Sequence, residues 1–209
     1  MSIKLKGSTD GSVTLQAPAD TSPTGTDKTL ILPTDVGSAN QYLKNGSTAG
    51  SLEFVTHRGF VTYAIICDEK TNGTVGGTFT SGAWQTRDLN TEIADPDGIV
   101  AISSNQFTLG AGTYLIEAFA PAHDVSKHQA RIYNATDSSV VEYGMNGLVS
   151  SGDTTQAASL AVARVTITAN TAFEIQHRCQ SSKSSTGFGV ATSFGGVEIY
   201  TLVRIYKEA

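Results

Sequence analysis

The sequence lacks the features that mark membrane, secreted and nucleic-acid-binding proteins. None of its 209 residues belongs to an apolar run near the ~20 residues that a membrane helix needs, so no membrane insertion is expected. No apolar segment follows residues 1–4, so we expect no signal peptide and synthesis in a cytoplasm. Charged residues make up only 16% of the chain, its net charge is −5, and it has no basic block, which argues against nucleic-acid binding.

Cysteine is equally scarce. Cys67 and Cys179 are the only two, they lie far apart, and neither belongs to a CxxC spacing. In a chain made in a cytoplasm this favours two reduced thiols in a core, and a disulfide between them is the unsupported alternative.

Helical periodicity is nearly absent, and the residues that are abundant indicate an all-β protein. Glycine is frequent, with 21 residues, and serine and threonine are dense. Aromatic and β-branched residues come in short runs separated by Gly, Asn, Asp and Ser, which is typical of strands joined by turns.

The first 56 residues differ from the remainder and are predicted to form an extended arm. Short β-prone pieces occur at 12–18, 29–33, 41–46 and 51–55, and none is long enough to make a core alone. Apolar side chains favour docking of this arm on a larger partner over a solvated linker, and we expect Leu30, Ile31, Leu32 and Phe54 to make the contact.

Residues 57–209 are predicted to form one β-sandwich. Strand patterns recur at the spacing of a sandwich, giving about eight to ten strands, enough for the two sheets of a jelly roll. The patterns lie at 59–70, 83–90, 99–103, 107–123 (two strands around Gly110–Gly112), 128–144 (a hairpin turning near 134–138), 159–169, 172–180 and 196–206.

The last strand, 196–206, is expected to be central. Strict alternation places Val197, Ile199, Thr201, Val203 and Ile205 on a core face. The opposite face carries Glu198, Tyr200, Leu202, Arg204 and Tyr206. Two tyrosines and a leucine are unusual on a solvent face, so this side is expected to be buried between layers or to face another copy of the chain.

The order of the pieces resembles the C1q/tumour-necrosis-factor-like jelly roll. The pieces are FTLGAGTYLIEAFA, ARIYN, SLAVARVTITANTAFEIQHRC and SFGGVEIYTLVRIY; Phe107, Gly112 and Tyr114 match one motif, and Phe194, Gly195 and Gly196 match another. The resemblance covers about residues 59–209. It implies a homotrimer with aromatic residues along its axis, and the residues here that suit this role are Tyr114, Tyr200, Leu202 and Tyr206.

The arm resembles a different group of proteins. Residues 6–55, from GSTDGSVTLQAPAD to KTLILPTDVGSANQYLKNGSTAGSLEF, are similar to the repeat-like arms of structural proteins of marine tailed phages. This resemblance implies a virion location and docking through residues 1–56 on another virion protein, such as a capsid, portal, tail or fibre-base protein. Together the two resemblances indicate a trimeric phage appendage, a short fibre or knob, that attaches to a host-surface glycan.

No enzyme signature is present, and we expect no enzyme and no cofactor. The sequence has no GxxxxGK[ST] loop, no GxGxxG between a strand and a helix, and no GxSxG elbow. A polysaccharide depolymerase would need paired carboxylates in a groove, and the carboxylates here are scattered. Asp95 and Asp97 are weak calcium candidates, but DPDG is a good β-turn sequence and the distant bidentate glutamate of a calcium loop is missing.

Three other groups have both a functional and a structural interpretation. His123, Asp124 and His128 are expected to be loop residues rather than a metal site or triad. His177 and Cys179 share a strand face and are expected in a core or interface, because nothing supplies two further metal ligands. Trp84, the only tryptophan, is expected to pack in a core or interface, and the alternative is stacking on a sugar ring.

Two alternatives to the appendage stay open. A capsid decoration protein, whether a head fibre or a cement protein, would need no receptor, whereas a secreted C1q-like adhesin would need no particle. The loops 71–82, 144–157 and 180–190 are the candidate ligand contacts, because long loops carry binding residues more often than strands do.

Overall fold

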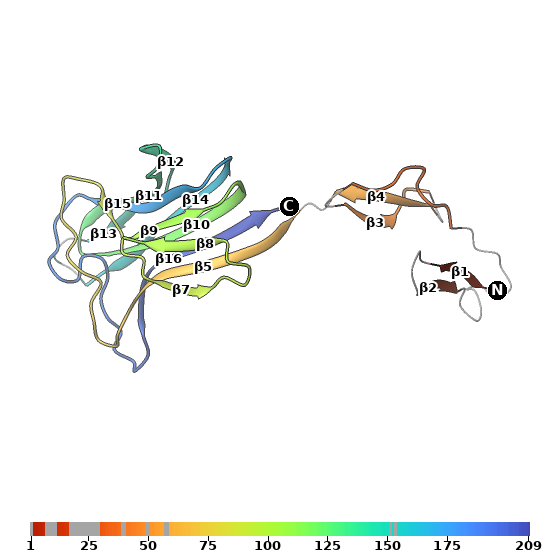
Figure 1. Cartoon of the computed structure of the whole chain (residues 1–209). Helices are drawn as coiled ribbons and strands as arrows, with labels where there is room; N and C mark the ends of the chain where they lie inside the picture. Colours follow the sequence, from red (N-terminus) through yellow and green to blue (C-terminus); the bar gives the residue numbers. More distant parts are fainter. Residues whose placement is uncertain are drawn as a thin grey trace. The chain divides into compact units, whose positions relative to one another are not determined.

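The computed structural model of the chain describes residues 2–6, 12–16, 30–38, 41–48, 51–56, 59–150, 152 and 154–209 (Figure 1). Every regular element in these ranges is a β-strand. A helix that could span a membrane is not found in the described part of the chain. The chain divides into two compact units, Met1–His57 and Arg58–Ala209.

The N-terminal unit contains two short antiparallel ribbons. Strands β1 (Ser2–Lys6) and β2 (Ser12–Gln16) form the first ribbon, and β3 (Gln41–Asn45) and β4 (Leu52–Thr56) form the second. The segment before β3 joins the second ribbon, because the amide of Leu52 donates to the carbonyl of Ile31 at 2.8 Å. A two-stranded ribbon has too little surface to bury its own apolar side chains.

The C-terminal unit is built from two sheets that pack face to face (Figure 1). The first, which we call the β16 sheet, has the order β14-β10-β16-β5-β7. Its strands are β5 (Phe60–Lys70), β7 (Thr91–Ala94), β10 (Gly112–His123), β14 (Gln156–Ile167) and β16 (Glu198–Glu208). As expected for the last strand of the chain, β16 is central, lying between β10 and β5.

The second sheet, the β11 sheet, has the order β12-β11-β15-β9-β8, and two short strands pair with β11 and β15 outside this path. Its strands are β8 (Val100–Ser103), β9 (Gln106–Leu109), β11 (Ser126–Asn134), β12 (Ser139–Tyr143) and β15 (Thr171–Cys179), with β6 (Gln85–Thr86) and β13 (Gly147–Val149) as the short ones. Two antiparallel sheets, of five and seven strands, with repeated crossings of the chain from one sheet to the other, make a jelly roll. The predicted all-β jelly-roll sandwich is confirmed.

The core lies between the inner faces of the two sheets. It is filled by alternating side chains of the long strands, among them Ile116, Ile132, Ile175 and Ile205, none of which has measurable solvent exposure. Phe107 and Phe173 stack across β9 and β15 with ring centroids 5.6 Å apart. Cys67 and Cys179 are buried free thiols, as the sequence analysis favoured.

The face assignment for the last strand is wrong in its first half, because β16 contains a bulge. Between Ile199 and Leu202 the strand advances three residues while its partner β5 advances two, from Glu69 to Cys67. One extra residue reverses the side-chain alternation. Val197 and Ile199, predicted for the core, are therefore 55% and 47% exposed. Glu198 and Tyr200 are buried instead, at 4% and 5% exposed.

The segment 83–90, predicted as one strand, serves as a crossing between the sheets. Only β6 pairs with β15, after which Arg87 and Leu89 turn inward and β7 pairs with β5. The guanidinium of Arg87 is buried, donates to the hydroxyl of Thr201 at 2.8 Å and lies over the ring of Phe188. Because Arg87 turns into the core at this point, residues 83–90 do not form a continuous strand, although their sequence alternates as a strand does.

Candidate functional site

Two surfaces of the C-terminal unit have a composition that packing within one protomer does not explain. The first is the outer face of the β16 sheet, which we call the apolar sheet face. Strand register places its side chains in rows, because residues directly opposite on paired strands share a face. The face consists of Tyr63, Ile65, Leu115, Phe119, Leu160, Val162, Leu202 and Tyr206, all at least partly exposed, with Phe60 against Tyr206 at 5.0 Å between ring centroids.

Charged side chains on the apolar sheet face are few and paired. Arg204 lies 3.9 Å from Glu117 and near the ring of Phe119. The guanidinium of Arg164 makes a bidentate ion pair with the carboxylate of Glu208, with nitrogen–oxygen distances of 2.8 and 2.7 Å. Contiguous apolar surface of this kind on a sheet typically marks an interface.

Of the four residues predicted to line a trimer axis, the structure places two on the apolar sheet face and two elsewhere. Leu202 and Tyr206 lie on it, in register with Phe119 and Leu115 of β10. Tyr114 belongs to the core, is 1% exposed, and donates its hydroxyl to the carbonyl of Gly110. The prediction for Tyr114 is wrong because its strand parity is that of the buried residue Ile116.

Tyr200 is likewise unavailable to a partner subunit. The β16 bulge turns its side chain away from Leu202, and its hydroxyl donates to the carbonyl of Thr74 at 2.7 Å. Its ring packs against Gly189, where an added Cβ would come within 2.4 Å of the ring. Tyr200 therefore holds two loops of its own protomer together, and its prediction as an interface residue is also wrong.

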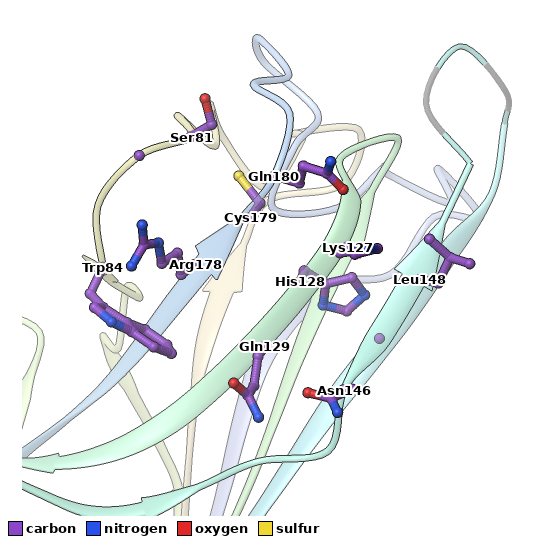
Figure 2. A pocket seen from close by; sticks show the side chains of 12 residues that line it. Ser81, Trp84, Lys127, His128, Gln129, Asn146, Leu148, Arg178, Cys179 and Gln180 are labelled. Atoms are coloured by element: carbon purple, nitrogen blue, oxygen red, sulfur yellow. The ribbon is translucent and has the colours of Figure 1, made fainter.

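The second surface is a groove of about 830 Å³ on the outer face of the β11 sheet (Figure 2), which we call the Trp84 groove. Its floor is formed by the ends of β11 and β15, where Gln129 pairs with Arg178 across the two strands. One wall is the segment 81–84 and the other is 146–148. Its lining residues are Ser81, Gly82, Trp84, Lys127, His128, Gln129, Asn146, Gly147, Leu148, Arg178, Cys179 and Gln180.

The three loops predicted to contact a ligand, 71–82, 144–157 and 180–190, meet near this groove. Phe79 and Lys183 form a β-bridge, which joins the first loop to the third. The ammonium of Lys183 lies 2.5 Å from a carboxylate oxygen of Asp124, and the other oxygen accepts from the amide of Gly152 in the second loop. Lys183 and Asp124 thereby tie the three loops to the start of β11.

Two buried histidines lie side by side, and one of them, His128, lines the groove. Nδ1 of His128 is 3.0 Å from Nε2 of His177, and both rings are buried. The outer nitrogen of each ring has no hydrogen-bond partner among the described residues. Burial, together with the positive charge of Arg87, lowers the pKa of His128 to about 4 and the pKa of His177 well below its usual value of 6.5.

The remaining predicted site residues have structural roles. Both carboxylate oxygens of Asp95 accept backbone amides, from Ile99 at 2.9 Å and Val100 at 3.0 Å, and a turn follows at Pro96 and Asp97. His123 contacts the hydroxyl of Thr186. Within the described residues no group of three His, Cys, Asp or Glu side chains is arranged to hold a metal ion.

In the N-terminal unit the predicted docking residues are exposed. Leu30, Ile31 and Leu32 are 64%, 52% and 65% exposed, and Phe54 is 36% exposed. A hollow of about 560 Å³ lies beside them, lined by residues 32–36, Ser38, Gln41 and 52–54. These side chains have the exposure that docking requires, while docking itself stays a prediction.

Sequence reasoning named Trp84 and the loops but missed the polar side chains of the groove floor. A signal for them is present. The outward positions of β11 read Lys127, Gln129 and Arg131, and those of β15 read Gln176, Arg178 and then Gln180. Neighbouring strands that both turn cations and amides outward predict a polar surface with one sign of charge.

No protein-family model matches the sequence, and no curated protein matches it. Among solved structures, the chain is similar to the globular domain of zebrafish complement 1qA, with 11% identity and a TM-score of 0.46 over 70% of this chain and 96% of that chain. Murine APRIL at pH 8.0 is 7% identical with a TM-score of 0.43, covering 70% and 98% of the two chains. Eiger TNF from S. frugiperda is 10% identical with a TM-score of 0.47, covering 72% and 94%. Similarities at this level identify neither a ligand nor an activity for this chain.

Proposed function

We propose that the chain is a homotrimeric structural protein of a phage virion, a short appendage that docks through residues 1–56 and presents its C-terminal unit to a host surface. The observation that carries the proposal is the apolar sheet face. In a monomer this face would be exposed to water, whereas fully burying one large apolar side chain stabilises a protein by about 1.5–3 kcal/mol. Association of copies through the same face would bury these side chains and gain part of that stabilisation for each of them.

Three-fold symmetry accounts for the position of the face. The apolar sheet face lies on the sheet whose central strand is β16. On that strand Leu202 is paired with Phe119 of β10, and Tyr206 is paired with Leu115 of β10 and Tyr63 of β5. Packing three such sheets around an axis buries the rows and leaves the β11 sheet outward. The paired charges Arg204–Glu117 and Arg164–Glu208 are compatible with an interface, because a paired charge costs less to bury than an isolated one.

Docking on a particle accounts for the N-terminal unit. Its described part carries exposed leucine and isoleucine side chains on thin ribbons, and the second ribbon holds one exposed ion pair, Lys44–Glu53 at 3.1 Å. A segment of this kind gains its stability from the surface on which it lies. The similarity of residues 6–55 to phage arms makes a virion protein the proposed partner.

Replacing Leu202 with lysine tests the trimer. Three like charges would meet without partners in a dry interface, at a cost of several kcal/mol, so L202K should elute as a folded monomer in size-exclusion chromatography with light scattering. The matched control is V140K, because Val140 is also a surface apolar residue of a strand, 36% exposed, but lies on β12 of the other sheet. A trimeric L202K, or a monomeric wild type at micromolar concentration, would refute the proposed assembly.

Particle imaging separates the appendage from a capsid decoration protein. Antibody labelling of intact virions should place the chain on a tail, fibre or head spike if it serves attachment, and evenly over the capsid if it only decorates. Detection of the protein in culture medium without particles would instead support a secreted adhesin.

A further inference from the structure

We infer that the Trp84 groove binds an acidic saccharide, with a sugar ring against the indole of Trp84 and anionic groups on Lys127 and Arg178. The inference deepens the proposed role in host-surface attachment and rests on it. It assigns the ligand class and the residues, neither of which follows from the apolar sheet face.

The charge of the groove selects an anion. Its lining contains the cations Lys127 and Arg178 and no aspartate or glutamate. Both side chains are exposed. Neither side chain has an ion-pair or hydrogen-bond partner within the described part of the chain. On a protein with a net charge of −5, two unpaired cations without a nearby lining carboxylate form a local site for negative charge.

The aromatic side chain of the groove selects a ring. Trp84 is held in place from the side of β11, where the guanidinium of Arg131 lies 4.1 Å from the centre of an indole ring. Tyr143 adds a second contact, with ring centroids 5.9 Å apart. Trp84 lines the groove and Arg131 does not, so part of the indole is left for a ligand. A fixed indole is a flat apolar surface of the kind that packs against the C–H face of a sugar.

Amide side chains complete the set of groups that recognise hydroxyls. Gln129, Asn146 and Gln180 line the groove together with Trp84 and the two cations (Figure 2). Gln129 is fixed, because its nitrogen donates to the carbonyl of Gly144 at 2.8 Å, and Oε1 of Gln180 accepts from the hydroxyl of Ser126. Amides both donate and accept, as hydroxyls do, whereas a site for nucleic acid would need many more cations than two.

The groove is formed in advance of binding. Its floor is paired β-sheet, and its wall is close to the floor because residue 147 is a glycine: an added Cβ there would lie 2.2 Å from Nε2 of His128. The volume of about 830 Å³ falls within the range of small-molecule sites and is large enough for a short oligosaccharide.

Tryptophan fluorescence tests the inference directly, because Trp84 is the only tryptophan in the chain. The full-length protein is titrated with a polygalacturonate tetrasaccharide, a sulfated heparin tetrasaccharide and, as the neutral match, maltotetraose, and binding is confirmed by calorimetry. We expect saturable fluorescence changes with one or both acidic sugars, at least about tenfold weaker binding of the neutral one, and an affinity that falls with rising salt.

Variants assign the binding to the groove. R178A and K127A should each weaken binding of the acidic sugar about tenfold, and W84F should weaken it in calorimetry. K44A is the control, since it also removes one positive charge but lies in the N-terminal unit, and it should bind as the wild type does. Unchanged melting curves show that each variant is folded.

Each outcome bears on a separate claim. Equal binding of neutral and acidic sugars, or no binding of either acidic sugar, overturns the inference, while the trimer and the virion location are tested by light scattering and imaging. Tight binding of an acidic sugar that R178A and W84F leave unchanged also overturns the inference, because the site then lies elsewhere, and it leaves the proposed attachment function intact.

Discussion

The buried pair His128–His177 predicts that the C-terminal unit loses stability in mild acid. A histidine whose pKa is lower in the folded protein than in the unfolded chain stabilises the fold at high pH. The stabilisation is complete above the unfolded value of 6.5 and disappears as the pH falls toward the folded value of about 4. Protonation is unfavourable because it would place a cation in a buried site that the charge of Arg87 already makes positive. One nitrogen of each ring has no hydrogen-bond partner among the described residues to stabilise that charge.

The magnitude follows from the pKa difference. For His128 alone, a pKa of about 4 against 6.5 removes about 2 kcal/mol between pH 7 and pH 5, and His177 acts in the same direction. A loss of this size lowers the melting temperature by about 5 °C in a domain of this length. The measurement is urea or thermal unfolding at several pH values and fixed protein concentration, in the L202K background so that assembly does not contribute.

The control is a variant without the pair. The double variant H128Q/H177Q keeps two side chains able to hydrogen-bond each other but removes both ionisable rings, so its stability should change little between pH 7 and pH 5. H123Q removes a histidine outside the pair and should retain the fall. A wild type with constant stability over this range, or a double variant that falls as steeply as the wild type, would show that the pair does not control the acid response.

Two further predictions concern the loops and the arm. Glu198 accepts four hydrogen bonds, from Gly73, Ser193 and twice from Thr192, and the backbone amides among them lower its pKa to about 2. E198Q should therefore speed the amide hydrogen exchange of residues 72–74 and 192–193 by about tenfold near pH 7. Unchanged exchange would show that other contacts hold these loops. Because its bonds require the carboxylate, the wild type should lose the same protection only as the pH falls below 4.5, which separates it from the histidine effect. Deleting residues 1–57 should leave a C-terminal unit that melts as it does in the full chain but no longer joins particles, and an unfolded product would show that the N-terminal unit contributes to the fold.

Local patterns were sufficient to predict most of the strands. The break at Gly110–Gly112 separates β9 from β10, and the hairpin between β11 and β12 turns where Asn134 and Asp137 hydrogen-bond each other. Both features depend on residues that are close together in the sequence, and turns formed by Gly, Asn and Asp can be predicted from the sequence alone.

Features that depend on pairing between distant segments were not predictable. The β16 bulge exists only relative to the register of β5, more than 130 residues earlier, so strict alternation gave the wrong face for Ile199 and Tyr200. Arg87 looked like one position of a strand, yet two nitrogens of its buried guanidinium donate to the hydroxyl of Thr201 and the carbonyl of Phe188, both more than 100 residues away. The Trp84 groove combines four segments of the chain, so its composition could be seen only once the sheet order was known.

The two outer faces of the sandwich have opposite chemistry, and this connects the two proposals. The β16 sheet turns leucine, phenylalanine and tyrosine outward, whereas the β11 sheet turns lysine, arginine and glutamine outward around Trp84. In the proposed trimer the first face is buried, so the second is the face that stays in water. Each particle appendage would then carry three identical grooves, and three weak contacts with a repetitive polysaccharide bind far more tightly than one. L202K should therefore bind a short acidic tetrasaccharide as the wild type does but lose most of its avidity for the long polymer, and equal loss for both sugars would show that the groove depends on the trimer for its shape.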